Sequence, residues 1–216
     1  MKRYKSALFL VLIASLFAGC LKETEDIFSV LGIVAITEDD MIIETDVGEK
    51  LLVENPTNAG TGIENNDRVI ADFTLVDKHA PAGFDYVINI HSILKVLFKP
   101  VIVLTDEIAD SIGSDEVEVN SLWLEKDFLN LSFSYYGGNE MHYINLIRHP
   151  GEIANDTINL EIRHNDNGDN ATSRLKGFVT FDLTSLRNEV TESVVLHITA
   201  RGFYNQTYQK NFTYRF

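Results

Sequence analysis

The chain after residue 26 alternates between short apolar runs and polar turns, a pattern typical of β-strands. The runs are rich in valine and isoleucine, whose branched side chains pack well on a pleated surface. A loop is expected at 55–66, which holds proline, glycine and several asparagines, whereas 93–98 fits either a helical turn or another strand. Five or so short strands in about 75 residues favour a small closed barrel of the OB type. The expected strands cover 30–36, 41–44, 50–53, 69–77 and 84–90.

A stricter alternation of apolar and polar positions follows residue 116. Leu129, Leu131 and Phe133 share one face of a segment, and later segments repeat the same period of two, which predicts strands with one buried face. Glycine, proline and asparagine interrupt these segments where turns are needed. About seven strands in about 100 residues indicate an Ig-like antiparallel sandwich.

These patterns predict a mostly β chain: a small OB-like barrel over 27–105, then an Ig-like antiparallel β-sandwich over 117–216. The polar segment 106–116, which contains Gly113, is the expected linker. No segment after Cys20 is long and apolar enough for a transmembrane helix.

The N-terminus resembles a bacterial lipoprotein signal. Basic residues precede an apolar stretch that is too short to span a bilayer, and Gly19 then leads into Cys20, the only cysteine. Residues 1–19 are therefore the expected signal peptide, and the Cys20 thiol is the expected site of lipid attachment. The alternative is an ordinary signal peptide followed by a chance cysteine. With Cys20 acylated, no thiol remains for a disulfide.

The composition restricts the partners. The chain has 216 residues, and removal of 1–19 leaves 15 basic against 32 acidic residues, a net charge of −17 with histidine neutral. Such a charge repels nucleic acid and anionic lipid surfaces. The expected membrane contact is therefore the acyl anchor at Cys20, and no nucleic acid partner is expected.

Candidate chemistry is sparse. No two histidines have zinc-ligand spacing, and motifs of serine hydrolases, P-loop proteins and zinc proteases are absent. The run 165–170 could offer oxygen ligands to calcium, but its asparagines and Gly168 equally suit a hairpin turn with positive φ, which we favour. We expect no catalytic residue, metal site or cofactor, and structural or solvent roles for the six histidines: His79, His91, His142, His149, His164 and His197.

Aromatic residues gather in the second half. Trp123 is expected in the sandwich core. Tyr135 and Tyr136 are neighbours, so one of them should face solvent, where it could contact a glycan or a protein.

Several short stretches carry a family resemblance. The strongest is 122–131, which reads Leu-Trp-Leu-Glu-Lys-Asp-Phe-Leu-Asn-Leu and is followed by His142 and Asn145-Leu146. The earlier stretches, in chain order, are Asn66-Asp67-Arg68-Val69, Leu75-Val76-Asp77, Asp85-Tyr86, Ile93-Leu94 and 99–102. The chain is similar to the NigD-like lipoproteins of Bacteroidetes, whose fold is an OB-like domain followed by an Ig-like sandwich. The family is associated with a bacteriocin gene cluster, and its biochemical activity is not established.

The resemblance suggests a role in export for the short acidic segment 20–26, whereas the alternative is a solvated tether. In Bacteroidetes lipoproteins a similar run after the lipid cysteine directs export, so we expect an outer membrane lipoprotein on the cell surface, with the periplasmic face as the alternative. Ser111 and Thr157 fit the O-glycosylation pattern of these bacteria. We expect an accessory module with an envelope protein or glycan partner; the alternatives are a glycan- or peptide-binding lipoprotein and a hydrolase.

Overall fold

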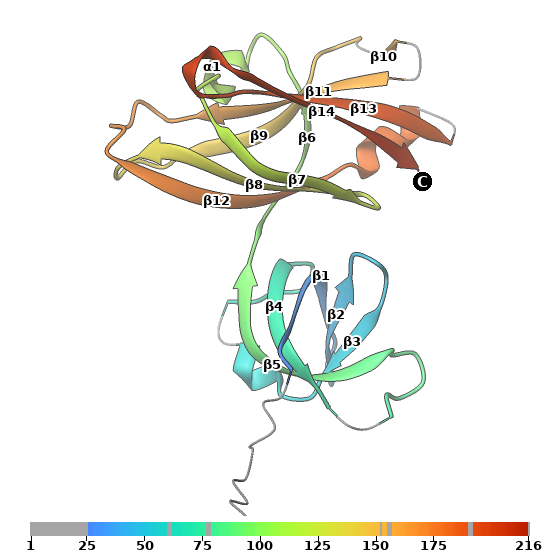
Figure 1. Cartoon of the computed structure of the whole chain (residues 1–216). Helices are drawn as coiled ribbons and strands as arrows, with labels where there is room; N and C mark the ends of the chain where they lie inside the picture. The colour runs from blue at the N-terminus through green and yellow to red at the C-terminus, as the bar shows by residue number, and fades with distance from the viewer. Residues whose placement is uncertain are drawn as a thin grey trace, which may run out of the picture.

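The computed structural model describes residues 26–59, 62–76, 79–151, 153–154, 157–189 and 192–215. Cys20 and the expected signal peptide lie outside these residues. Two β units follow each other along the chain and meet at a narrow joint (Figure 1). Among the described residues, no helix is both long and apolar enough to cross a membrane.

The first unit is a closed barrel in the order β1-β2-β3-β5-β4. β1 is long enough to pair with both β2 and β4, and Gly32 takes part in both pairings, opposite Thr45 and Val69. A Cβ atom at Gly32 would come within 2.5 Å of the Ile43 side chain, so glycine permits this close approach. The strands are β1 (Phe28–Ile36), β2 (Met41–Thr45), β3 (Lys50–Val53), β4 (Arg68–Leu75) and β5 (Tyr86–Lys95), with the 3₁₀ helix η1 (Pro56–Ala59) in the predicted loop.

The second unit is a sandwich whose strands follow the order β14-β13-β11-β9-β6-β12-β8-β7, with β10 paired to β11. Its strands are β6 (Leu97–Val103), β7 (Glu118–Glu125), β8 (Phe128–Gly137), β9 (Tyr143–Arg148), β10 (Ile153–Ala154), β11 (Thr157–Asn165), β12 (Ser173–Asp182), β13 (Ser193–Arg201) and β14 (Thr207–Arg215). The short helices are α1 (Ala109–Ile112), η2 (Thr184–Glu189) and η3 (Phe203–Asn205).

β6 links the two layers of the sandwich. Its first residues, Leu97 to Pro100, pair with β12, and its last, Val101 to Val103, pair with β9. Both pairings are parallel, as is that of β11 with β13, so the sheet is mixed and contains parallel pairs that the alternation did not predict.

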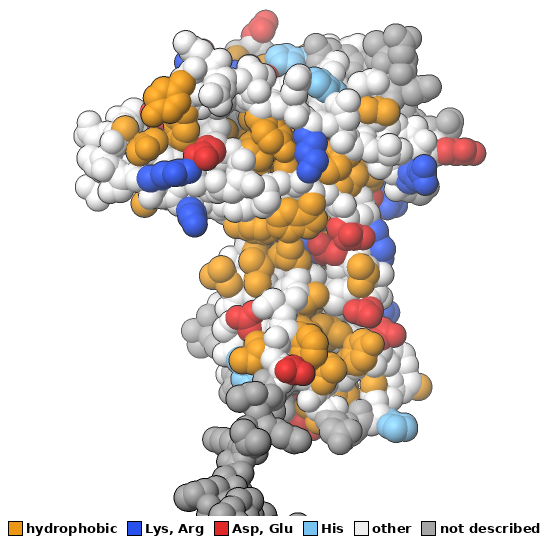
Figure 2. Space-filling model, in the orientation of Figure 1, with side chains coloured by type: hydrophobic (Ala, Val, Ile, Leu, Met, Phe, Trp, Pro, Cys, Tyr) orange, Lys and Arg blue, Asp and Glu red, His pale blue; other side chains and the backbone are white. Residues whose placement is uncertain are grey.

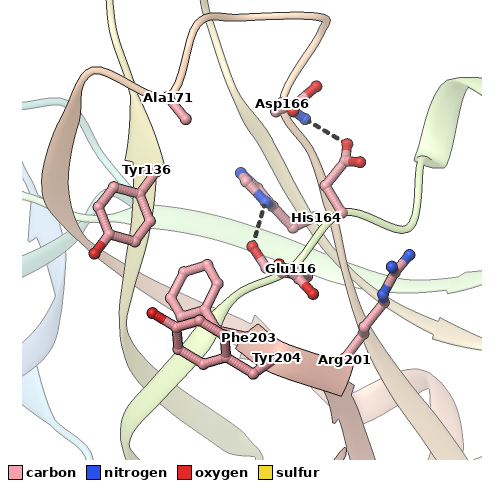
Figure 3. A pocket seen from close by; sticks show the side chains of 9 residues that line it. Glu116, Tyr136, His164, Asp166, Ala171, Arg201, Phe203 and Tyr204 are labelled. Atoms are coloured by element: carbon pink, nitrogen blue, oxygen red, sulfur yellow. Dashed lines mark hydrogen bonds between the residues drawn. The ribbon is translucent and has the colours of Figure 1, made fainter. Parts of the chain in front are cut away.

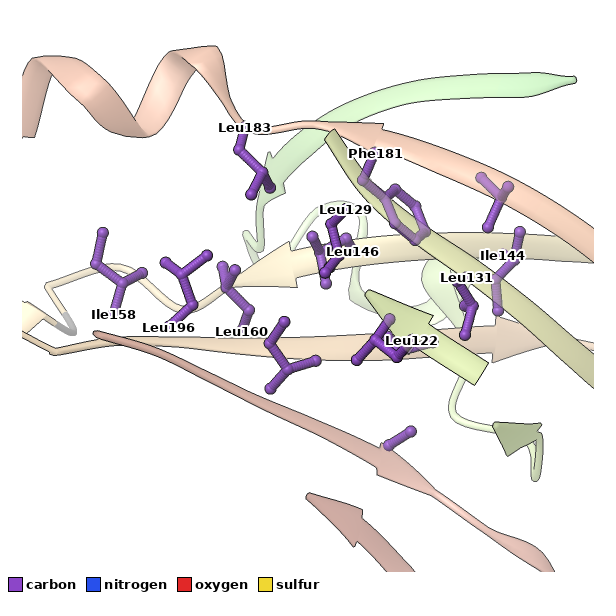
Figure 4. Packing of buried hydrophobic residues seen from close by; sticks show 14 of the residues in the cluster. Leu122, Leu129, Leu131, Ile144, Leu146, Ile158, Leu160, Phe181, Leu183 and Leu196 are labelled. Atoms are coloured by element: carbon purple, nitrogen blue, oxygen red, sulfur yellow. The ribbon is translucent and has the colours of Figure 1, made fainter. Parts of the chain in front are cut away.

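Each unit has its own hydrophobic core. In the sandwich, leucine and isoleucine side chains from facing strands point toward one another (Figure 4). The fully buried residues include Leu129, Leu131, Phe181 and Leu196, each with no exposed surface. The period of two therefore identified the buried face correctly, and the expected barrel and sandwich are confirmed.

The boundary between the units differs from the expectation. The sequence placed the end of the barrel at 105 and a linker at 106–116, but β6 pairs only with sandwich strands. A single residue, Val96, separates β5 from β6, and the segment 93–98 is strand on both sides of it. An apolar run that leaves one sheet and enters another has no break in its hydrophobic pattern, so periodicity misses this boundary.

A buried ion pair fills the joint. Arg68 of β4 is 1% exposed, and its guanidinium contacts both carboxylate oxygens of Asp46. The same guanidinium reaches into the sandwich, where it lies 3.3 Å from Thr180 Oγ1 and 4.4 Å from the centre of the Phe128 ring. On the face shown in Figure 2, hydrophobic side chains gather at this joint, with charged side chains beside them. The contact therefore fixes one unit on the other through a charge that water does not reach.

We expect Gly177→Ala to destabilise the sandwich by about 1–3 kcal/mol, because the site is already full. Gly177 lies opposite Phe133 in the pairing of β12 with β8, and an added Cβ atom would come within 2.3 Å of the ring. The free energy of unfolding in urea measures the loss. Gly202→Ala is the control, since its nearest contact would be 3.4 Å away; equal losses in the two variants would contradict this explanation.

Candidate functional site

A pocket of about 410 Å³ opens at one end of the sandwich. Three aromatic side chains form one side of it, and charged side chains lie across from them (Figure 3). The lining residues are Asp115, Glu116, Tyr136, His164, Asp166, Ala171, Arg201, Phe203 and Tyr204. They come from the segment before β7, the end of β8, the end of β11 with the β11–β12 loop, and the end of β13 with the β13–β14 connection, so the sandwich topology assembles the pocket from four distant parts of the chain.

The β13–β14 connection presents its aromatic residues through an unusual backbone. Tyr204 and Asn205 both have positive φ, at 58° and 59°. This conformation is costly for a tyrosine, and such strain persists only where surrounding contacts enforce it. Here the Gly202 N–H donates to the Gln206 carbonyl at 2.8 Å and closes the turn. The result is a Tyr204 side chain that is 88% exposed beside the pocket.

Tyr136 completes the aromatic side. Its ring meets Phe203 edge to face, with the ring centres 5.3 Å apart. Tyr136 is exposed whereas Tyr135 packs against the core, which confirms the expectation that one of the two faces solvent. Trp123 is different from the expectation: it is only half-buried and packs on Phe178, because its neighbour Leu122 points into the core.

A chain of histidine contacts lies behind the pocket. His164 Nδ1 is 3.1 Å from the Glu116 carbonyl oxygen, and its Nε2 is 2.9 Å from His142 Nδ1. His142 Nε2 in turn lies 3.0 Å from an Asp169 carboxylate oxygen. The Tyr135 ring packs against both imidazoles, 4.7 Å and 5.4 Å from their centres.

These contacts indicate which ring nitrogens of His142 and His164 carry a hydrogen. The Glu116 carbonyl can only accept, so His164 Nδ1 carries a hydrogen, and the Asp169 carboxylate likewise requires a hydrogen on His142 Nε2. The contact between the rings needs one further hydrogen, because two lone pairs would otherwise face each other. Burial lowers the pKa of His164, which favours the neutral form of this ring. The N–H group of Gly138, followed by His142, lowers the pKa of Asp169, which favours its charged form.

Burial, followed by the proximity of His142, lowers the pKa of His164 below its usual 6.5, although the Glu116 carbonyl, Asp115 and Asp166 oppose this. The unfolded chain therefore binds more protons at this residue below pH 6.5, and stability falls as pH decreases from 6.5 toward the folded pKa.

We expect the melting temperature of the wild type to fall between pH 7 and 5 more steeply than that of His164→Asn, which keeps a donor for the Glu116 carbonyl. Thermal unfolding across this range measures the difference. Parallel curves for the two proteins would show that His164 does not titrate differently in the folded state.

The pocket is lined by more acidic than basic side chains. Asp115, Glu116 and Asp166 face Arg201 alone, a net charge of −2 with His164 neutral. Asp115 accepts from the Asp166 N–H at 2.9 Å, and Arg201 donates to the Ser114 carbonyl at 3.1 Å. In the part of the chain that the structure describes, no hydrogen bond reaches the Glu116 carboxylate, so it is available to a ligand.

The segment 165–170 is a turn, as expected. Asn167 and Gly168 have positive φ, at 55° and 72°, and an Asp166 carboxylate oxygen accepts from the Gly168 N–H. Within the described ranges, no group of three or more histidine, cysteine or acidic side chains is placed to hold a metal ion.

The two expected glycosylation residues lie apart from the pocket lining. Ser111 is in α1 and exposed, and its hydroxyl donates to the Ile108 carbonyl at 2.8 Å. Thr157 begins β11. Glycosylation of either residue stays a prediction, as does lipid attachment at Cys20.

Sequence reasoning missed the histidine chain and the role of Tyr204. His164 continues the inward row of Ile158, Leu160 and Ile162, so its burial could have been predicted. Its contact with His142 depends on the register of β11 with β9, which periodicity does not give. The left-handed backbone at Tyr204 has no sequence signal, since tyrosine disfavours it.

The model of the NigD-like C-terminal beta sandwich domain matches residues 100–214, from within β6 almost to the end of the described chain. No curated protein matches the chain.

Solved structures share the whole two-unit fold. A protein of Parabacteroides distasonis, provisionally named toxin-related, is 27% identical, with a TM-score of 0.68 over 87% of this chain and 93% of its own. A NigD-like immunity protein of Bacteroides caccae is 18% identical, with a TM-score of 0.65 over 89% of this chain and 97% of its own. A provisionally named lipoprotein of Bacteroides fragilis is 11% identical, with a TM-score of 0.64 over 88% of this chain and 98% of its own. None of these three names describes an enzyme.

Proposed function

Because this chain belongs to the family of the NigD-like C-terminal β-sandwich domain, we propose that it is a membrane-anchored envelope lipoprotein that works as a non-enzymatic binding module. The observation that carries the proposal is the pocket at the end of the sandwich, where exposed aromatic side chains stand beside charged ones. A hollow in which polar side chains converge beside aromatic ones is typical of ligand-binding sites.

The arrangement of His164 supports binding rather than catalysis. His164 lines the pocket, yet one of its nitrogens is hydrogen-bonded to the Glu116 carbonyl and the other to His142. A general base needs a nitrogen within hydrogen-bond reach of its substrate. An imidazole with both nitrogens engaged holds the pocket wall in place instead.

The anchor rests on the N-terminal sequence, with support from the provisional name of the Bacteroides fragilis relative. The name of the Bacteroides caccae relative, an immunity protein, also fits a protein that acts by binding. We further propose that the protein is exported to the outer surface of the outer membrane. Protease treatment of intact cells should then degrade it while a periplasmic control survives; its protection would place it in the periplasm.

Binding is tested by thermal unfolding of the acylated protein in non-ionic detergent, with envelope glycans and short peptides as ligands. A ligand of this site should raise the melting temperature of the wild type and not that of Tyr204→Asn. Asparagine tolerates the positive φ at 204, so this variant removes the ring without new strain. An equal rise in the melting temperature of both proteins would show that the ligand binds outside this pocket. No rise in melting temperature with any ligand would contradict the binding function.

A further inference from the structure

We propose that the pocket binds the cationic side chain, arginine or lysine, of a peptide segment. The inference rests on the proposed binding function and names its partner class. Two features of the pocket carry it, namely its charge and its aromatic side, and a second hollow beside it accounts for the peptide.

The charge of the pocket selects a cation. Its net charge is −2, and the Glu116 carboxylate, without a hydrogen-bond partner among the described residues, is available to pair with a ligand. His164 does not oppose a cation, since burial lowers its pKa and favours its neutral form. Arg201 is partly engaged by the Ser114 carbonyl. The surrounding protein, with far more acidic than basic residues, also attracts cationic segments from a distance.

The aromatic side suits the same ligand. Tyr136, Phe203 and Tyr204 stand across the pocket from the acidic groups (Figure 3). The faces of aromatic rings attract ammonium and guanidinium groups, and guanidinium also stacks on them. A cation between rings and carboxylates therefore gains from both sides, whereas an anion would be repelled by the carboxylates and a neutral sugar would leave their charge uncompensated.

A second hollow explains why the cation belongs to a peptide. It has about 420 Å³ and shares Phe203 and Tyr204 with the first pocket, so the two hollows flank the same pair of rings. Val117, Val119 and Tyr208 supply apolar surface in this second hollow. A segment that crosses the rings could place its cationic side chain in the first hollow and a neighbouring apolar side chain in the second.

The test uses the acylated protein in non-ionic detergent and fluorescein-labelled peptides in which arginine alternates with glycine and serine. Matched peptides carry lysine, glutamate or glutamine in place of arginine, and fluorescence anisotropy gives each Kd. The arginine and lysine peptides should bind, and the glutamate peptide should not.

Local variants separate the pocket from general charge attraction. Tyr204→Asn should raise the Kd of the arginine peptide by about three- to thirtyfold. Glu116→Gln keeps the side-chain shape and should raise it by about fivefold. Matched changes in the barrel, Tyr86→Asn and Glu49→Gln, should change it by less than about twofold. Neither residue lines the pocket, and the exposed Glu49 charge is screened at that distance.

Each result decides something different. If the pocket and barrel variants bind the arginine peptide as the wild type does, only general attraction remains and the pocket proposal is overturned. Preference for the glutamine peptide, or for an envelope glycan, would overturn the cationic partner while leaving the binding function intact. Failure of every ligand to bind or to stabilise the protein would instead count against the proposed function itself.

Discussion

Asp46→Ala should lower the free energy of unfolding by about 3–5 kcal/mol, the cost of leaving a buried charge without its partner. The Arg68 side chain has no exposed surface, and Asp46 is the carboxylate that contacts it. After the substitution, the contacts left to the guanidinium among the described residues are hydrogen bonds of 3.3 Å to Thr180 and Asn130 and the face of the Phe128 ring. These neutral contacts do not replace a charge-assisted pair. Urea unfolding followed by far-UV circular dichroism measures the loss.

Two further proteins distinguish this explanation from the loss of any ion pair. Glu118→Ala removes an exposed carboxylate that contacts Arg174, so its cost should be below about 1 kcal/mol. The double variant Asp46→Leu with Arg68→Met replaces the pair by apolar groups and should recover most of the stability. If Asp46→Ala costs no more than Glu118→Ala, the Arg68 charge is reached by water and the joint is weaker than described.

Cys20→Ala should move the protein almost completely from the membrane fraction to the soluble fraction. The expected anchor is acyl chains on this one thiol, and a multi-chain anchor is far more persistent than a single chain. The described residues contain no helix that could replace it. Fractionation of cells, followed by a carbonate wash of the membranes and detection of the protein, measures the distribution.

The matched variant for this experiment is Phe17→Leu, which keeps the apolar stretch and Cys20 and should leave the protein in the membrane. Metabolic labelling with a radioactive fatty acid should mark the wild type and Phe17→Leu but not Cys20→Ala. Retention of Cys20→Ala after the wash would disprove the anchor assignment.

The sequence predicted those parts of the fold that depend on local periodicity. Leu129, Leu131 and Phe181 are buried as the alternation requires, because a strand with one buried face repeats every second residue. The end of the barrel was missed, since Leu97–Val103 is an ordinary apolar strand whichever sheet it joins. Sheet membership depends on partners far along the chain, and no local pattern encodes it.

The candidate site was predictable only in part. Tyr136 could be placed at the surface because neighbouring strand residues face opposite ways. The pairing of His142 with His164 joins residues from before β9 and from the end of β11, and it exists only when those strands have found their register. Sites assembled from several loops cannot be predicted from hydrophobic periodicity, since loops follow no period.

With the proposed anchor at Cys20, the joint between the units would also determine how far the pocket stands from the bilayer. Phe28, at the start of β1, pairs with Phe73, five residues beyond Arg68 along β4, roughly 17 Å from the joint. Tyr136 lies six residues beyond Asn130 along β8, roughly 20 Å from it on the sandwich side. For a protein anchored at Cys20, the barrel is then a spacer of fixed height. A one-residue connection at Val96 and a buried ion pair leave it little freedom to fold back, so the pocket of the anchored protein would meet the proposed partner above the lipid headgroups and not among them.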